Sequence, residues 1–404
     1  MSLLMDMNAQ IVIKKKRGIF LLLFFLCILV LVFVFFIQDI GFDEPSSPYI
    51  RKLKNSSLLA GNYLTRICSD GIFAYEYNAL TNSIDTNKYN LLRHAGTIYS
   101  MMQLYDVTEE QDLRDDAKDA IDFLLGYKKE YDNISCIVSA DRIKLGGTAL
   151  TIIALVEYTK ATNDDQYVSI AQDLAEYIEF SQLQTGEFIS KRSYPSGEIS
   201  DFVSNYYPGE TLLALCRLYS VDGNKRWLDI AEKGAQYLIV VRDGNRSIDQ
   251  LIHDHWLLMA LNELYRYRPN SMYLNHSLRI AEAIMHKQKT KQDGYDNDTI
   301  GSFTSVRSTP TATRSEGLIA AYHLSKDYCN KTVSEQILQS IRLAVDFQLQ
   351  MQFTKENVVD LPNPSIALGG FRDSFDSYVI RIDYVQHNLC SILGLYHMLK
   401  NASS

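Results

Sequence analysis

Side chains capable of acid–base chemistry recur at one kind of position in this sequence. Four of the eight histidines lie at or just inside the starts of apolar helical segments, and carboxylates, arginines and aromatic rings stand beside them. A histidine beside a tyrosine and an arginine can remove a proton next to the carboxylate of a uronate, and two carboxylates can together cleave a glycosidic bond. The starts of these segments are therefore the expected place for a catalytic site.

Acids and histidines at these starts are the catalytic candidates. Glycoside hydrolysis needs one protonated carboxyl group and one ionised carboxylate. Asp254 and Asp383 are the preferred pair, because histidine, arginine and tyrosine flank them. The alternative for each acid is an ordinary cap or first-turn charge at a helix N-terminus. The full set of candidates is Asp254, Asp383, Glu210, Glu316, His94, His255 and His387.

Arginines and aromatic rings at the same starts are candidates for binding a substrate. Arginine holds carboxylate or phosphate groups through two parallel hydrogen bonds, and aromatic rings stack on the apolar faces of sugars. Together they predict a pocket for a glycan, and the number of arginines favours an acidic one. The alternative is that the arginines pair with nearby acids and the rings pack over the helix ends. The candidates are Arg93, Tyr207, Trp256, Arg314, Arg372, Arg381 and Tyr384.

The sequence predicts neither a metal site nor a cofactor. His253 and His255 are two residues apart, so on a helix they point in different directions, and no cysteine is near them. The Gly-Gly pairs at 146–147 and 369–370 lack the spacing of a phosphate-binding loop, and turns or close helix contacts explain them better.

A repeat positions these residues. Six times, a polar opening precedes an apolar helical segment, and an amphipathic segment follows, at a period of roughly 45–70 residues. One helix pair per unit is typical of a helical array or a closed toroid. The openings span residues 93–97, 144–148, 206–210, 253–256, 314–317 and 381–384.

Six helix pairs predict an all-α fold, an (α/α)6 barrel. The apolar segments predict inner helices over residues 96–105, 148–158, 210–219, 256–265, 317–324 and 385–399. The amphipathic segments predict outer helices over residues 48–68, 112–127, 165–180, 225–240, 272–287 and 334–350. The first outer helix would close the ring against the last inner helix. Because the inner helices then run parallel, all six polar openings should meet at one end.

The connections support that end as the functional one. Links from inner to outer helices are short turns, whereas the links from outer to inner helices are roughly 10–30 residues long and carry many of the glycines, rings and charges. Alternation within residues 71–77 predicts a short β-hairpin that ends near residue 89. The predicted toroid thus has short β-hairpins and long loops at one end.

The N-terminus is predicted to anchor the chain in a membrane. Residues 18–37 are apolar throughout and long enough to cross a bilayer, and the basic run 14–17 before them should stay in the cytoplasm. The predicted parts are a cytoplasmic tail (1–17), a transmembrane anchor (18–37), a linker (38–47) and the toroid domain (48–404). The expected protein is single-pass, with the bilayer as a partner and its C-terminal domain outside the cell. A cleaved signal peptide is the alternative.

Composition limits the remaining classes of function. A chain of 404 residues with 47% hydrophobic content suffices for one large core, and no boundary for a second domain is visible within residues 48–400. The net charge of −8 gives no reason to expect a nucleic-acid partner.

The pattern resembles the six-hairpin glycosidase superfamily. The resemblance covers about residues 48–400 and rests on the repeat, on Tyr-Pro-Gly-Glu at 207–210 and on the Gly-x-Phe segments at 71–73 and 186–188. It implies an (α/α)6 toroid related to glycoside hydrolases, polysaccharide lyases and sugar epimerases. No single family's catalytic signature matches, so the resemblance assigns no catalytic residue.

Three functions follow as hypotheses. The first is a glycoside hydrolase acting on a cell-surface or extracellular glycan. The second is a polysaccharide lyase or uronate epimerase acting on an anionic glycan, and the third is a toroid that binds a glycan or a partner protein without catalysis. Two unpaired carboxylates in a deep pocket would favour hydrolysis. A group of tyrosine, histidine and arginine with every carboxylate paired would favour a lyase or an epimerase.

Overall fold

The computed structural model describes residues 47–403. The predicted tail (1–17) and membrane anchor (18–37) lie outside the described residues, as does the predicted linker up to residue 46. Within residues 47–403, none of the helices combines the length and the apolar character that crossing a bilayer requires. Residues 52–404 form one compact unit, and it is this unit that carries the toroid.

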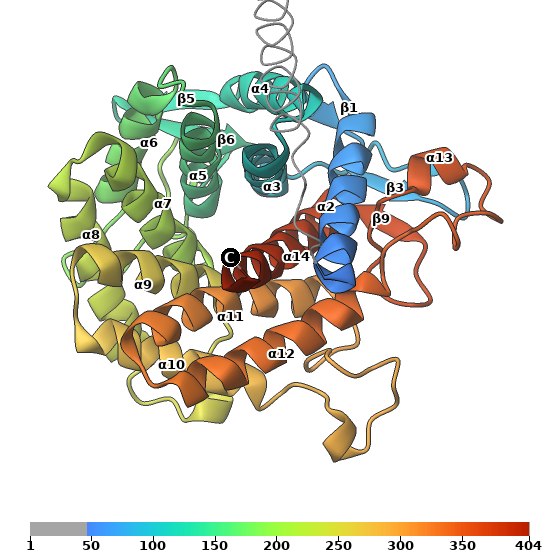
Figure 1. The fold of residues 1–404 in the computed structure, drawn as a ribbon. Helices are drawn as coiled ribbons and strands as arrows, with labels where there is room; N and C mark the ends of the chain where they lie inside the picture. Colours follow the sequence, from blue (N-terminus) through green and yellow to red (C-terminus); the bar gives the residue numbers. More distant parts are fainter. Residues whose placement is uncertain (1–46, 404) are drawn as a thin grey trace, which may run out of the picture. The chain divides into compact units, whose positions relative to one another are not determined.

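Six inner helices form a closed ring (Figure 1). Each packs against the next along the chain, and the last packs against the first, so that α14 and α3 complete the circle. The predicted helical toroid is therefore confirmed. The inner helices are α3 (Leu91–Thr108), α5 (Leu145–Thr162), α7 (Tyr207–Asp222), α9 (His255–Tyr267), α11 (Ser308–Tyr328) and α14 (Ile382–Ser403).

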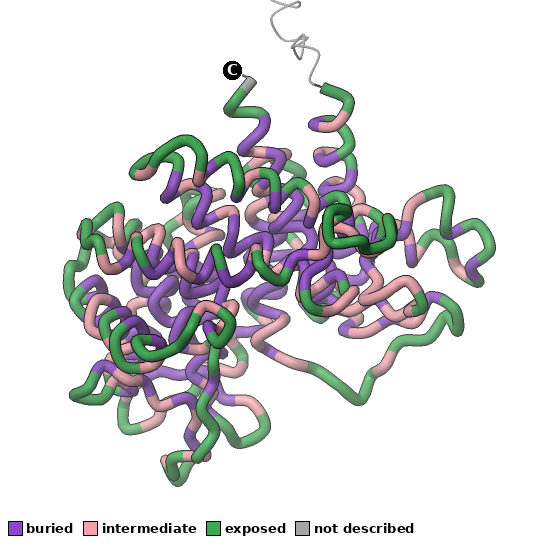
Figure 2. The backbone as a smooth tube through the Cα atoms, turned by 90° about the horizontal axis from the view of Figure 1, so that it is seen from below, coloured by how far each residue is buried: buried purple, intermediate pink, exposed green. Residues whose placement is uncertain are grey.

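Outer helices cover the ring with one apolar face each. In α4, the buried residues are Leu113, Ala117, Ala120, Ile121 and Leu124, a spacing that puts them on one side of the helix. By contrast, α5 is buried almost all round its first three turns, as expected for a helix enclosed by neighbours. The burial colours show that buried segments lie in the interior of the molecule and exposed ones at its outside (Figure 2). The outer helices are α2 (Pro48–Arg66), α4 (Gln111–Leu125), α6 (Val168–Phe180), α8 (Lys225–Gln236), α10 (Ser271–Met285) and α12 (Lys331–Leu349).

The sixth outer position is taken by α2. Its Ser56 hydroxyl donates to Gln352 Oε1, just after α12, at 2.6 Å. Its Gly61 faces Leu104 of α3. These contacts place the helix beside the seam between α14 and α3, as the pattern predicts.

Short turns join each inner helix to its outer partner. The side chains of Asn224, Asn270 and Asn330 each accept a hydrogen bond from the first turn of the next outer helix, which satisfies backbone N–H groups that the helix itself cannot. The other end of the toroid has the longer links, so the polar openings meet there.

Small antiparallel sheets tie these longer links together. One sheet has the order β4-β3-β9 and another the order β5-β6-β7-β8, while β1 and β2 form a separate hairpin. The predicted hairpin near residues 71–89 is therefore two hairpins. The strands are β1 (Cys68–Ser69), β2 (Ile72–Phe73), β3 (Glu76–Asn78), β4 (Ser83–Ile84), β5 (Lys128–Tyr131), β6 (Ile134–Ser139), β7 (Arg142–Lys144), β8 (Lys191–Ser193) and β9 (Val379–Arg381).

Glycines let neighbouring inner helices approach one another closely. A Cβ added to Gly209 would lie 2.7 Å from the backbone nitrogen of Leu257 and 2.8 Å from Oδ1 of Asp254. A Cβ added to Gly317 would lie 3.1 Å from Cα of His255. Helix α9 is thus held between α7 and α11 at distances that a larger residue would not allow.

Replacing Gly209 by alanine should destabilise the fold, because the new methyl group meets backbone that cannot move aside. We expect a loss of about 1–3 kcal/mol in the free energy of unfolding, measured by urea denaturation. Gly147→Ala is the matched control, since its Cβ would meet Leu92 Cδ1 at 3.5 Å and Lys144 Cβ at 4.0 Å, both ordinary contact distances. The control should be neutral or gain up to about 1 kcal/mol. Equal stability of both variants would contradict the close-approach argument.

Candidate active site

A cavity of about 600 Å³, here called the front cavity, opens among the first turns of the inner helices. All six inner helices contribute to its wall, as expected if the polar openings converge. The structure brings eight of the fourteen predicted site residues to this wall: Arg93, Tyr207, Glu210, His255, Trp256, Arg314, Asp383 and His387.

Two histidines stand together in the front cavity. The rings of His255 and His387 are 5.5 Å apart between centroids and nearly perpendicular, and Trp256 packs 4.7 Å from His255. Burial, followed by the neighbouring His387, lowers the pKa of His255 well below its ordinary value, so this imidazole is neutral. Neither ring nitrogen of His255 has a hydrogen-bond partner within the described part of the chain. A neutral imidazole with free nitrogens is suited to accept a proton from a bound molecule.

Glu316 orients the second histidine. Its Oε1 lies 2.8 Å from Nδ1 of His387, whereas its Oε2 is buried and has no partner among the described residues. Burial raises the pKa of Glu316, and His387 opposes that rise. Glu316 is not part of the front cavity wall, so it acts on a ligand there only through His387.

Glu210 is the carboxyl group in this wall without a charged partner. It is 5% exposed, and its Oε2 makes no hydrogen bond to a described residue. Burial, followed by the negative charge of Asp254, raises the pKa of Glu210 to about 8. At neutral pH it is therefore a protonated acid. Gly146 makes room for it, because a Cβ at that position would overlap Oε2 of Glu210 and the ring of Tyr207.

Asp383 is held by two arginines. Arg381 contacts both of its oxygens, at 2.5 and 2.9 Å, and Arg93 Nε lies 3.0 Å from Oδ2. This carboxylate faces the front cavity but is already paired, which limits its freedom to act as a base or nucleophile.

Asp254 lies behind the front cavity wall and is not part of it. Its side chain caps α9 by accepting from the backbone nitrogen of Leu257 at 3.1 Å, and Arg242 lies 3.4 Å away. Arg242 arrives there because α8 runs on into a π-helix, Tyr237–Arg242. Burial raises the pKa of Asp254 to about 6, and Arg242 opposes this. The geometry favours the capping alternative, so the preferred pair does not form two free carboxylates.

His94 sits in a structural cluster away from the front cavity. Tyr89 Oη lies 2.8 Å from Nδ1, the carbonyl of Ala120 lies 2.8 Å from Nε2, and Phe73 and Phe123 pack on the ring. Burial lowers the pKa of His94 to about 4. Its two nitrogens are both used, which leaves none for a substrate.

Three predicted binding residues also lie outside the front cavity wall. Arg372 donates to the carbonyl of Phe375 at 3.0 Å, within the loop before α14. Arg381 stacks 4.4 Å above the ring of Tyr384 while holding Asp383. Arg381 and Tyr384 thus follow the alternative of paired arginines and packing rings, whereas Arg372 donates to backbone carbonyls.

Arg314 is a positively charged residue of the wall. None of its hydrogen bonds to the described residues goes to a carboxylate. Its Nε donates to Nδ1 of His253 at 3.0 Å, and Nη1 donates to the carbonyl of Pro310 at 2.8 Å. Burial lowers the pKa of Arg314, but a guanidinium remains charged at neutral pH. Because Glu210 is neutral, the wall keeps this positive charge available for a ligand.

Sequence reasoning missed Gln386, which is 2% exposed and lies in the wall between Asp383 and His387 along α14. The available signal was its position three residues after Asp383, on the same face of the helix. It also missed Tyr206 and Asn90 as wall residues, because loop residues have no periodicity that reveals their direction.

His255, Glu316 and His387 are the described residues that could hold a metal ion, since their ligand atoms lie within 4.8 Å of one another. However, the 2.8 Å separation between His387 and Glu316 is that of a hydrogen bond. Two ligands on one zinc ion, each bound at its usual length, lie roughly 3.3 Å apart. We therefore treat the group as proton-transfer residues and assign no metal.

Comparisons with known proteins agree on the fold. Residues 189–344 match the family described as Beta-L-arabinofuranosidase, GH127 catalytic domain. A D-mannose isomerase is similar in structure, with a TM-score of 0.64, 15% identity and coverage of 88% of this chain and 98% of that one. Cellobiose 2-epimerase from Bacillus thermoamylovorans B4167 has a TM-score of 0.66, 14% identity and coverage of 87% and 99%.

A glycoside hydrolase has the same architecture. An inactive variant of the α-1,6-mannanase GH76A of Salegentibacter sp. HEL1_6, bound to α-1,6-mannotriose, has a TM-score of 0.61, 12% identity and coverage of 86% and 99%. No curated protein matches the sequence. At these identities the structural matches establish the toroid and leave the reaction to be argued from the residues.

The unusual titration of Glu210 should make stability depend on pH. In the unfolded chain a glutamate titrates near about 4.3, whereas folding raises the pKa of Glu210 to about 8. Between these values the folded protein holds a proton that the unfolded chain has lost, so Glu210 lowers stability progressively as pH rises from about 5 to about 8. Glu210→Gln should remove this contribution and melt at a higher temperature than wild type toward pH 8.

The control is Glu198→Gln at an exposed position, which should follow wild type at every pH. Melting temperatures measured across this range decide the point. Parallel curves for Glu210→Gln and wild type would show that Glu210 is ionised like an ordinary surface acid.

Proposed function

We propose, from the six-hairpin glycosidase-like toroid fold that this chain has, that it is a carbohydrate-active enzyme that moves protons on a sugar, a sugar epimerase or isomerase. The observation that carries the proposal is the His255–His387 pair in the front cavity, with free nitrogens on His255 and a carboxylate behind His387. Two neighbouring imidazoles can move protons at adjacent atoms of one substrate.

The reaction needs only proton transfer. One of the two imidazoles takes a proton from the carbon next to the carbonyl of an open-chain sugar. The electron pair of that C–H bond forms a carbon–carbon double bond, and the π pair of the carbonyl moves onto its oxygen. Glu210, protonated at neutral pH, donates a proton to this oxygen, which gives an enediol. An imidazole then returns a proton to carbon while an enediol hydroxyl gives one back to the protein, which yields an epimer or an isomer. The surrounding helix N-termini favour the negative charge that develops on oxygen.

Among the described residues, the wall of the front cavity lacks the pair of carboxyl groups that hydrolysis needs. Hydrolysis needs one acid and one free carboxylate, but Asp383 is held by two arginines. The similar mannanase is inactive when two consecutive aspartates are replaced. In this chain the consecutive aspartates are 115–116 and 164–165, and neither pair lies in the front cavity wall.

Glycoside hydrolysis is the second candidate. The match of residues 189–344 to an arabinofuranosidase family favours it. Glu210 would then be the acid, and Asp383 would have to leave Arg93 or Arg381 to act as the base or nucleophile.

Relatives and charge suggest which sugars to test. The similar structures include a mannose isomerase and a cellobiose epimerase, so mannose and cellobiose are the first substrates. Because no carboxylate pairs with Arg314 in these hydrogen bonds, uronates are a second class of sugar to test. Tyr207 and Trp256 supply the rings on which a sugar can stack.

Replacing either histidine should abolish the proton transfer. His255→Asn and His387→Asn should each lower kcat by about 100-fold or more, because asparagine cannot exchange a proton at neutral pH. Product formation and solvent deuterium incorporation, followed by NMR in deuterated water, measure this. His286→Asn, on the outer helix end with a side chain 56% exposed, is the matched control and should keep full activity.

Activity retained in both histidine variants would contradict the proposal. So would release of new reducing ends from mannotriose or arabinofuranosides by wild type, if no epimer or isomer forms. That outcome would move the assignment to Glu210 and Asp383 as a hydrolytic pair.

We also propose that residues 18–37 anchor the protein in the cell membrane with the toroid outside, because their apolar length and the preceding basic run suit that topology. The full chain should stay with membranes after an alkaline carbonate wash, and detergent should release it. A chain lacking residues 1–46 should remain in the soluble fraction. Release of the full chain by carbonate alone would argue against an anchor.

A further inference from the structure

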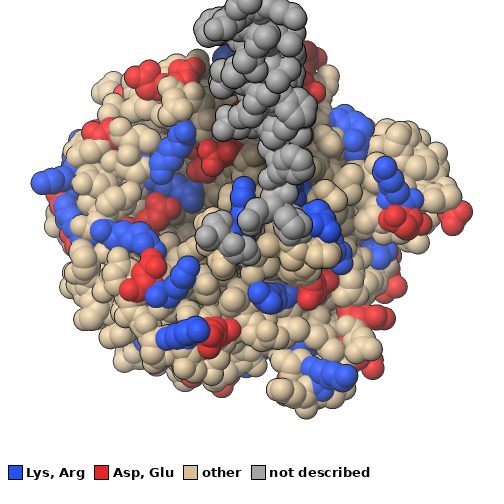
Figure 3. Space-filling model, in the orientation of Figure 1, with Lys and Arg blue, Asp and Glu red and all other residues tan. Residues whose placement is uncertain are grey.

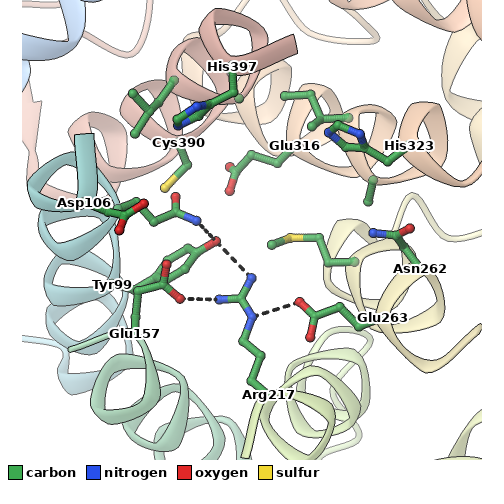
Figure 4. Close-up of a pocket in the computed structure, with 16 residues that line it drawn as sticks. Tyr99, Asp106, Glu157, Arg217, Asn262, Glu263, Glu316, His323, Cys390 and His397 are labelled. Carbon is green, nitrogen blue, oxygen red and sulfur yellow. Dashed lines mark hydrogen bonds and ion pairs between the residues drawn. The ribbon is translucent and has the colours of Figure 1, made fainter. Parts of the chain in front are cut away.

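A second cavity lies at the opposite end of the inner ring (Figure 4). This rear cavity has a volume of about 240 Å³ and shares no wall residue with the front cavity. Its wall comes from later turns of the inner helices, which point away from the polar openings. Charged side chains of both signs surround the hollow at this end of the ring (Figure 3).

The wall of the rear cavity carries many polar groups beside apolar side chains such as Met259 and Leu393. Arg217, which is 7% exposed, lies 3.3 Å from Glu157 and 3.0 Å from Glu263, and its Nη2 donates to Tyr99 Oη at 3.4 Å. Toward solvent the wall includes half-buried Asn262, His323 and His397 and the exposed Asp106. A polar cavity of this size holds several water molecules.

Glu316 connects the two cavities. It is a wall residue of the rear cavity, and its Oε1 contacts Nδ1 of His387 in the front cavity wall. Tyr99 of the rear wall and Trp256 of the front wall also lie close to each other, with ring centroids 6.5 Å apart.

The second oxygen of Glu316 is the observation that points to a ligand in the rear cavity. Glu316 is 5% exposed, and its Oε2 has no hydrogen-bond partner within residues 47–403. A buried carboxylate oxygen without a partner is costly, and water in the adjoining polar cavity would satisfy it. Figure 4 shows the carboxylate of Glu316 directed into this space, opposite Arg217.

We propose that water in the rear cavity and the carboxyl group of Glu316 form a proton route between solvent and His387 that bypasses the front cavity. After His387 gains a proton from substrate at Nε2, the proton on Nδ1 passes to Oε1 of Glu316. Rotation of the carboxyl group about its Cγ–Cδ bond then presents that proton to a rear-cavity water, which carries it out. Charge and atoms balance, because one proton leaves and His387 is neutral with its proton on Nε2. The same steps in reverse restore the Nδ1 proton when His387 gives its Nε2 proton to the product.

This route rests on the proposed function and explains how the histidine is reset while a sugar fills the front cavity. Without it, His387 would keep a positive charge for as long as a sugar fills the front cavity.

Filling the rear cavity tests the route. Ala320 lies in the rear wall one turn after Glu316 and does not touch the front cavity wall. Ala320→Leu should displace the water, whereas Ala320→Ser should keep it and serves as the control of similar size. The direct measurement is NMR of protein labelled with ¹⁵N-histidine, which reports exchange of the His387 Nδ1 proton with water. His387→Asn identifies the signal.

The route predicts that exchange slows several-fold in Ala320→Leu and stays as in wild type in Ala320→Ser. Asn262→Phe, at the half-buried mouth, should give the same slowing if Ala320→Leu does not fold. Unchanged exchange at His387 in a folded, filled variant would overturn the route.

The ¹⁵N measurement needs no substrate, so it separates the two proposals. If no sugar is epimerised or isomerised but filling the rear cavity slows exchange, the route stands and the proposed function fails. If proton transfer on a sugar occurs and exchange is insensitive to filling, the function stands and the route fails.

Discussion

Six parallel helices that converge by their N-termini impose one constraint on this end of the toroid: every polar group brought to the axis must find a partner or remain costly. Much of the sequence near the axis meets this demand locally. Asn90 caps α3, and Asp254 caps α9 and pairs with Arg242. Asp383 is satisfied by two arginines.

The groups left without partners around the axis are the informative ones. They include both nitrogens of His255 and one oxygen each of Glu210 and Glu316. Burial without a partner shifts the balance between charged and neutral forms, which makes His255 a neutral base and Glu210 a protonated acid. Incomplete satisfaction of buried groups thus sets the protonation states of these residues.

The sequence predicts the helices and their order well, because an inner helix is apolar all round and an outer helix has one apolar face. It also predicts which end carries the site, since the polar openings recur at one place in the repeat. The sequence does not reveal that Asp254 and Glu210 have different surroundings, because both stand at such openings. The difference arises from Arg242, which the π-helix after α8 carries to Asp254, and from Gly146, which opens a space for Glu210.

Contacts across the ring are equally hidden from sequence. Glu316 and His387 are 71 residues apart, and only the packing of α11 against α14 brings them together. His94 shows the opposite case, because its place at an opening suggests chemistry while tertiary packing commits both of its nitrogens to Tyr89 and Ala120. The position of a residue in the repeat thus predicts at which end of the toroid it lies. Its role depends on the partners that it meets from other parts of the chain.

Closure of the ring also has a consequence for how the protein is made. The Arg93–Asp383 ion pair joins the first inner helix to the last, and α14 supplies His387, Gln386 and Asp383 to the front cavity. During synthesis the earlier helix pairs can associate with their neighbours as they leave the ribosome, as in other repeat proteins. The cavity, however, lacks one side until the final segment has emerged and docked. The front cavity of a nascent chain is therefore incomplete until α14 has left the ribosome and docked, and a truncation that removes α14 would leave the cavity open on that side.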